Sequence, residues 1–302
     1  MASLPTVDLQ TFLHGSPTQQ QDFVQTLGQA LETVGFFALE NHTVDAELIQ
    51  AAYGAAADFF ALPTAVKQNY ERPEIYRQRG FTSFGQEHAK DSAQPDLKEF
   101  WHLGREELAN PWPQEVPQFQ QTMSQLYSQL EKCAAYLLNA CACYLDLPEE
   151  FFEQEAAQGK SILRVLHYPP QPTSAKGLRA APHEDINLIT LLCEATDPGL
   201  ELLQSDGSWL AIEPLPGQII VDTGDMLQAL TNGVFKSTTH RVVNADIGTT
   251  RRFSLPFFMH PRPEFDLTPL PGCVERTGEP AKFPAQTAQQ YLQQRLQEIG
   301  LA

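Results

Sequence analysis

A His-x-Asp motif and a distant histidine are the residues of this chain best suited to hold a metal ion. The motif is His183-Glu184-Asp185, and the distant residue is His240. In an extended segment residues i and i+2 point to the same side, so His183 and Asp185 can reach one ion while Glu184 points away. Two histidines and one carboxylate on one face of an iron ion leave the opposite positions open, which oxygen chemistry requires. The sequence therefore predicts a metal site at His183, Asp185 and His240.

The surroundings of the motif strengthen this prediction, because a lone His-x-Asp is a weak signal that recurs by chance. An apolar, partly β-branched run, Ile186–Leu192, follows the motif and favours a buried strand. A half-buried structural histidine is the alternative for His240, but two ligands alone would bind iron poorly. The remaining histidines lie in the helical or irregular first third, or on other expected strands without a following anion site: His14, His42, His88, His102, His167 and His260.

Arg252-Phe253-Ser254 is the second motif with chemical potential. On an expected strand from Arg252 to Phe258, Arg252 and Ser254 share one face and Phe253 takes the other. A guanidinium binds a carboxylate through two parallel hydrogen bonds, and a hydroxyl can add a third. A surface arginine is the alternative, but an inward-facing charge is costly unless it meets an anion. The motif therefore predicts a carboxylate clamp beside the metal.

Several short motifs in order resemble the iron(II)/2-oxoglutarate-dependent dioxygenase superfamily, in the branch of isopenicillin N synthase and the plant flavonoid and hormone oxygenases. The resemblance covers nearly the whole chain. Besides the two motifs above, its residues are Val34–His42, Arg79-Gly80-Phe81, Lys98–Trp101, Tyr168-Pro169-Pro170, Thr231-Asn232-Gly233 and His240-Arg241-Val242.

The resemblance implies an activity and a role for each site residue. It implies that His183, Asp185 and His240 bind iron(II), and that Arg252, Ser254 and Tyr168 hold the distal carboxylate of 2-oxoglutarate. The implied reaction couples oxidative decarboxylation of 2-oxoglutarate by O2 to hydroxylation or desaturation of a small organic substrate. The chain departs from many plant members at Leu166, where they have asparagine. This departure removes one polar contact expected near the iron.

Four further residues are candidate substrate contacts. Arg79 and Phe81 belong to a segment expected to cover the pocket, and Phe258 and His260 follow the clamp on the face of Arg252. The alternatives are that Phe258 packs in the core and that Arg79 pairs with a nearby carboxylate.

Composition limits the partners of the chain. Its 302 residues carry a formal net charge of −17, which repels nucleic acid and anionic membranes. No apolar run reaches the roughly 18 residues that a membrane helix needs, and no signal-peptide pattern is present. The five cysteines lack Cys-x-x-Cys spacing, so neither disulfides nor a zinc knuckle is indicated. We expect a cytoplasmic monomer that acts on a small molecule.

Residue periodicity predicts helices first and strands later. Helices are expected at Thr18–Thr33, Val44–Phe60, Gln118–Leu145 and Ala285–Ile299, and a long loop-bearing region at Arg72–Pro113. Short strands are expected at Ile162–Tyr168, Leu188–Cys193, Leu200–Leu203, Gln218–Asp222, Thr239–Val243 and Arg252–Phe258.

These elements indicate a mainly β fold with flanking helices. The strand succession suggests a double-sheet jelly roll, and the resemblance implies its cupin-like form, the double-stranded β-helix. We expect an N-terminal helical and covering region at 1–115 and a catalytic core at 116–302, integrated in one domain.

Three other functions remain open on the sequence. An oxidase of the same fold would use iron without consuming 2-oxoglutarate, and an Arg-x-Ser pair would not exclude it. A non-catalytic metabolite sensor would not need a complete ligand set. A zinc hydrolase is weaker still, because no general base accompanies the ligands.

Overall fold

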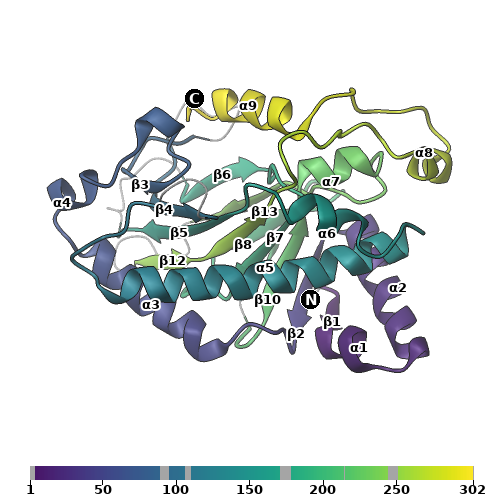
Figure 1. Ribbon diagram of the computed structural model, residues 1–302, viewed down its shortest axis with the longest axis horizontal. Helices are drawn as coiled ribbons and strands as arrows, with labels where there is room; N and C mark the ends of the chain where they lie inside the picture. Colours follow the sequence, from purple (N-terminus) through teal and green to yellow (C-terminus); the bar gives the residue numbers. More distant parts are fainter. Residues whose placement is uncertain are drawn as a thin grey trace.

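A large sheet forms the centre of the molecule (Figure 1). The computed structural model describes residues 4–88, 95–105, 110–170, 178–213, 215–243 and 251–301. Within these ranges nine strands form the large sheet, with β12 (Arg252–Ser254) beside β5 and the others in the order β1 (Thr6–Asp8), β2 (Phe36–Glu40), β10 (Ile219–Thr223), β7 (Ile189–Cys193), β13 (Pro256–Met259), β5 (Ile162–Tyr168), β4 (Glu99–Gly104) and β3 (Gly80–Thr82).

A smaller sheet carries the histidines of the expected metal site. In the described residues its four strands follow the order β6 (Ala180–His183), β11 (His240–Val242), β8 (Leu200–Leu203) and β9 (Trp209–Ala211). Residues of both sheets line one cavity, so the site lies between them. This arrangement confirms the expected mainly β, two-sheet core with flanking helices.

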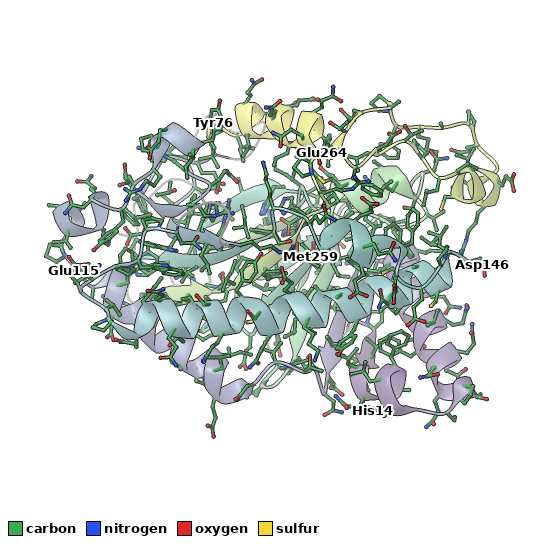
Figure 2. All side chains as sticks on the ribbon, in the orientation of Figure 1. His14, Tyr76, Glu115, Asp146, Met259 and Glu264 are labelled. Carbon is green, nitrogen blue, oxygen red and sulfur yellow. The ribbon has the colours of Figure 1, made fainter. Side chains whose placement is uncertain are left out.

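Helices cover the outer face of the large sheet and the ends of the core (Figure 1). The long α5 (Gln118–Tyr144) packs on β7 and β13, burying apolar residues spaced three and four apart, as expected. Met259 of β13 is buried in this core and is labelled beside α5 in Figure 2. The other helices are α1 (Leu9–His14), α2 (Pro17–Thr33), α3 (Ala46–Phe60), α4 (Thr64–Gln68), the 3-10 turn η1 (Pro73–Ile75), α6 (Phe151–Ala156), α7 (Asp225–Leu230), α8 (Pro271–Thr277) and α9 (Ala288–Glu298).

The segment Arg72–Pro113, expected to be loop-bearing, contains two strands of the large sheet. All six residues of β4 are buried, and β4 pairs along its whole length with β5. Because both faces of β4 are covered, its sequence does not alternate between polar and apolar residues, which hid the strand. Strands on both sides of residue 115 belong to the same sheet; the division into two regions there stays a prediction. No described helix is long and apolar enough to cross a membrane.

Candidate metal centre and co-substrate pocket

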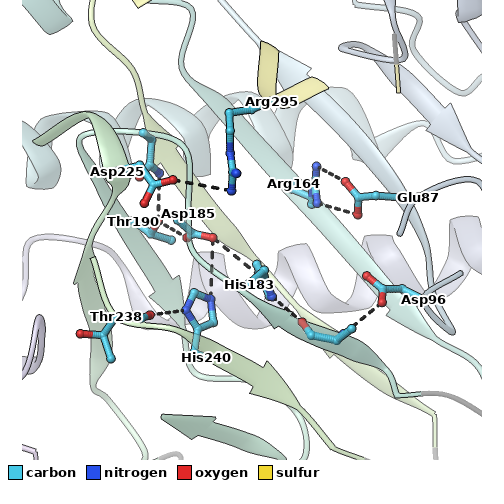
Figure 3. A network of polar contacts seen from close by, with 12 residues as sticks. Glu87, Asp96, Arg164, His183, Asp185, Thr190, Asp225, Thr238, His240 and Arg295 are labelled. Atoms are coloured by element: carbon cyan, nitrogen blue, oxygen red, sulfur yellow. Dashed lines mark hydrogen bonds and ion pairs between the residues drawn. The ribbon is translucent and has the colours of Figure 1, made fainter. Parts of the chain in front are cut away.

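Two paired strands bring the expected metal ligands together. β6 and β11 run antiparallel with His183 opposite His240, and their rings lie 4.4 Å apart between centroids. The Oδ1 atom of Asp185 lies 3.8 Å from Nε2 of His183 and 3.7 Å from Nε2 of His240. Figure 3 shows the three side chains converging. Among the described residues they are the one group of three histidine, cysteine or acidic side chains close enough to hold a metal ion.

Backbone carbonyls orient both histidines for metal binding. Nδ1 of His183 lies 2.8 Å from the oxygen of Ala181, and Nδ1 of His240 lies 3.1 Å from the oxygen of Thr238. A carbonyl only accepts, so each Nδ1 carries the proton and each Nε2 keeps a free lone pair. Burial and the neighbouring His240 lower the pKa of His183 to about 4. The ring of His183 is therefore in the neutral form that coordinates metals.

Neighbouring side chains fix the carboxylate of Asp185. The hydroxyl of Thr190 donates to Oδ2 of Asp185, and the amide of Asn187 donates to that hydroxyl across 2.9 Å. Oδ1 remains directed toward the two histidines. A second acid, Asp222, is buried nearby, and its burial and the charge of Asp185 raise its pKa well above the usual range. The ionised form of Asp222 is therefore disfavoured.

Replacing Thr190 with valine tests how far this hydrogen bond supports the metal site. Valine keeps the shape but cannot donate to Asp185, so the carboxylate loses its orientation. We expect the affinity for iron(II) to fall about tenfold. Anaerobic iron titration of the Thr190→Val variant measures it; an unchanged affinity would show that Asp185 is held by the backbone alone.

The expected clamp lies at one end of the same cavity. β12 pairs with β5 so that Arg252 is opposite Tyr168 and Ser254 is opposite Leu166, and all four residues line the cavity. The guanidinium carbon of Arg252 lies 5.1 Å from the centre of the Tyr168 ring. Phe253 faces the opposite side and packs in the core, as the period of two predicts.

The guanidinium of Arg252 is ready for an anion. The side chain is buried, and its Nε donates to the oxygen of Asp197 across 2.9 Å. Its Nη1 is buried and has no hydrogen-bond partner in the described part of the chain. A buried donor without a partner is costly, and a carboxylate would satisfy it. The residues present therefore fit 2-oxoglutarate.

The cavity has a volume of about 590 Å³ and continues well beyond the clamp. Alternate residues of β5 line it, from Tyr168 through Leu166 and Arg164 to Ile162. Alternate residues of the segment that forms β12 and β13, which both pair with β5, also line the cavity, from Arg252 through Ser254, Pro256 and Phe258 to His260. Helix α9 adds Leu292, Arg295 and Leu296. One wall thus runs from the co-substrate end, beside Arg252 and Tyr168, to the other end of the cavity. That end, beside Phe258, His260 and α9, is named here the second compartment.

The four candidate substrate residues separate into two pairs. Phe258 and His260 line the second compartment. Arg79 and Phe81 are not among the described residues that line the cavity, and their role as substrate contacts stays a prediction. The Phe81 ring is fully buried and packs in the core 5.9 Å from the Phe59 ring, because β3 is a strand of the large sheet rather than part of a cover. Arg79 is turned away from the cavity, toward Gly104, and donates to the oxygen of Gln78 across 2.6 Å.

A buried cluster of charged residues in this compartment was missed by sequence reasoning. It consists of Glu87, Asp96, Lys98 and Arg164 and is named here the Glu87 cluster. Figure 3 shows its members Glu87, Asp96 and Arg164. It also touches the metal site, because Asp96 accepts the N–H of Ala181, whose carbonyl binds His183. The alternation of β5 could have placed Arg164 in the cavity, since Arg164 has the parity of Tyr168. No local signal marks Glu87 as its partner.

The Glu87 cluster predicts a pH dependence of stability. Neighbouring Arg164 and Lys98 hold the pKa of Glu87 far below its usual range despite its burial. A carboxylate whose pKa is lower in the folded state stabilises the fold above its unfolded pKa, and this contribution is lost as the pH falls. We expect Glu87→Gln to cost about 3 kcal/mol at pH 7. The gap to wild type should narrow by about 1.5 kcal/mol at pH 3. Urea unfolding at pH 7, 5 and 3 measures it, and a constant gap would contradict it.

Comparison with known proteins agrees with this geometry. The model of the N-terminal part of non-haem dioxygenases in morphine synthesis matches residues 4–124, and that of the 2OG-Fe(II) oxygenase superfamily matches residues 159–261. A 2-oxoglutarate-Fe(II) type oxidoreductase of Aspergillus fumigatus is 31% identical over 94% of this chain and 89% of its own length.

Solved structures share the fold over nearly the full chain. A putative 2OG-Fe(II) oxygenase family protein from Caulobacter crescentus is 38% identical, with a TM-score of 0.87 and 99% of both chains covered. A full-length Neurospora crassa protein in complex with alpha-KG and thymine is 26% identical, with a TM-score of 0.88, covering 97% of this chain and 96% of that chain. The chain therefore belongs to the 2OG-Fe(II) oxygenase superfamily. It is a 2-oxoglutarate- and iron(II)-dependent dioxygenase with O2 as co-substrate, and its core is the double-stranded β-helix.

Proposed function

We propose that His183, Asp185 and His240 hold the iron(II) ion of this dioxygenase. In the same proposal Arg252, Ser254 and Tyr168 bind the distal carboxylate of 2-oxoglutarate, and a small organic substrate fills the compartment beside Phe258 and His260. A cytoplasmic location and a monomeric state are further parts of it. The observation that carries the proposal is one cavity lined both by two preorganised histidines and by Arg252, whose buried Nη1 has no hydrogen-bond partner among the described residues.

In this proposal the protein residues bind and orient the co-substrate and the substrate, and they exclude water from the site. When bound, iron(II) and 2-oxoglutarate supply the oxidation, in which O2 and 2-oxoglutarate yield succinate and CO2 and the substrate is hydroxylated or desaturated. The side chains of Arg252 and Tyr168 would fix one end of the co-substrate, so that its other end lies toward the histidines. The buried walls keep bulk water from the reacting centre, and the second compartment holds the substrate near the metal.

An anaerobic titration tests the proposal directly. Apoprotein receives iron(II) and then 2-oxoglutarate, while the visible metal-to-ligand charge-transfer band of the chelate is monitored. We expect the band to appear at one equivalent of each. Iron binding without the band would favour the oxidase of the same fold, and no iron binding would favour the sensor.

A further inference from the structure

Cations at the substrate end of the cavity are already neutralised by carboxylates. In the Glu87 cluster, Nζ of Lys98 lies 2.6 Å from Oε2 of Glu87 and 2.8 Å from Oδ2 of Asp96. Nη2 and Nη1 of Arg164 lie 3.0 Å and 3.2 Å from the two oxygens of Glu87. Two cations thus face two carboxylates, and the charges balance.

The two remaining cations of the cavity wall, Arg295 and Arg252, differ in whether a carboxylate neutralises them. Arg295 of α9 lies 3.0 Å from Glu298 and 3.6 Å from Asp225. Figure 3 shows Arg295 reaching from α9 toward Asp225. For Arg252, in contrast, no carboxylate of the described residues lies within ion-pair distance. Of the four cations described in this wall, only Arg252 thus awaits an anion, and 2-oxoglutarate supplies it.

Two of the histidines that line the cavity here, His102 and His260, add no charge. Nε2 of His102 accepts from Nε of Arg164 across 2.6 Å, so its proton is on Nδ1, which lies 2.9 Å from the oxygen of Arg77. Nδ1 of His260 lies 3.1 Å from the oxygen of Phe258 and carries the proton there. Burial also lowers the pKa of His260 to about 4. His260 therefore offers a neutral acceptor at Nε2.

The other walls of the compartment are mainly apolar. They are formed by Ile162, Phe258, Leu292, Leu296 and Ile299. A carboxylate entering here would lose its hydration and face the charge of Glu87, and the described lysine and arginine side chains around it are already paired with carboxylates. A neutral molecule would bury apolar surface against these walls and could donate a hydrogen bond to His260.

We propose that the primary substrate is a neutral, largely apolar molecule, and that Glu87 determines this preference by occupying Arg164. This proposal rests on the proposed function in one respect: it takes the second compartment as the place where the substrate binds. Glu87 acts by rejecting acids, because without it the guanidinium of Arg164 would bind them.

Matched pairs of probes that differ by one charge test the proposal. Benzamide and benzoate, and indole-3-acetamide and indole-3-acetate, are titrated into the iron(II)·2-oxoglutarate protein without oxygen and followed by ligand-observed NMR. We expect wild type to bind each amide at least tenfold more tightly than its acid. Glu87→Gln should bind the acids at least tenfold more tightly than wild type, with amide affinities changed less than threefold.

Two control variants separate this effect from a general change in charge. Glu155→Gln removes a carboxylate that pairs with Arg262 outside the cavity, and it should leave the amide preference unchanged. The double variant Glu87→Gln/Arg164→Gln should lose the gain in acid binding. If Glu87→Gln does not fold, Glu87→Asp replaces it: its shorter side chain draws the carboxylate back from Arg164, and we expect acid affinity to rise at least threefold.

The outcomes distinguish this proposal from the proposed function. The same titrations in Arg252→Ala apoprotein need neither iron nor 2-oxoglutarate, and that variant lacks the other anion site. If the Arg252→Ala apoprotein prefers amides while wild-type protein shows no charge-transfer band, only the proposed function is contradicted. Wild-type protein that binds acids as tightly as amides, or a Glu87→Gln variant without a gain for acids, would overturn the neutral-substrate proposal.

Discussion

Replacing Asp185 with alanine will lower the affinity for iron(II) at least about 100-fold, beyond the effect of losing an outer-shell contact. Among the described residues Asp185 is the one carboxylate within 4 Å of both Nε2 atoms, and a carboxylate ligand offsets the charge of the cation. The two histidines that remain leave the ion with one protein ligand fewer and without a carboxylate. Anaerobic iron titration followed by calorimetry measures the loss.

His260→Ala provides the matched control for the metal ligands. His260 also lines the cavity and keeps a free Nε2, yet it is not part of the metal group. Iron affinity should remain within threefold of wild type in this variant. Iron binding that survives in Asp185→Ala but fails in His260→Ala would show that the ligand set is misassigned.

Replacing Arg252 with alanine will weaken 2-oxoglutarate about 100-fold, with iron affinity retained. Removing one partner of a buried, hydrogen-bonded charge pair typically costs 2–5 kcal/mol or more. Nη1 has no hydrogen-bond partner among the described residues, so none of them satisfies this group. The charge-transfer band, titrated with 2-oxoglutarate at fixed iron, measures the change.

Arg252→Lys refines the interpretation of the clamp. Lysine keeps the charge but loses the planar pair of donors, so we expect only partial recovery of 2-oxoglutarate affinity. Arg262→Ala, which changes an arginine paired with Glu155 outside the cavity, serves as the control. Unchanged 2-oxoglutarate affinity in Arg252→Ala would move the carboxylate site to another residue.

Local sequence patterns were sufficient for the site because its geometry is local. The period of two in a strand placed Arg252 and Ser254 on one face and Phe253 on the other, and the structure has this arrangement. The i, i+2 relation likewise brought His183 and Asp185 to one side. Only one pairing between distant segments, that of β11 with β6, was needed to bring His240 to His183.

Features that depend on long-range pairing were not predictable in the same way. β4 is buried on both faces by neighbours distant in sequence, so its pattern carries no strand periodicity. The partnership of Glu87 with Arg164 joins residues 77 positions apart. The contribution of α9 to the cavity likewise depends on how the C-terminal segment returns to the sheets, which composition and spacing do not encode.

The shared wall of β5 and its neighbour strands has an evolutionary consequence. Arg252 and Phe258 are six residues apart, roughly 20 Å of extended chain. Substitutions at the far positions, such as Ile162 or Phe258, can therefore change which substrate is oxidised, while Arg252 and Tyr168 continue to bind the co-substrate. Within one pair of strands, selection can hold one end constant and diversify the other, so new substrate preferences need not cost the enzyme its chemistry.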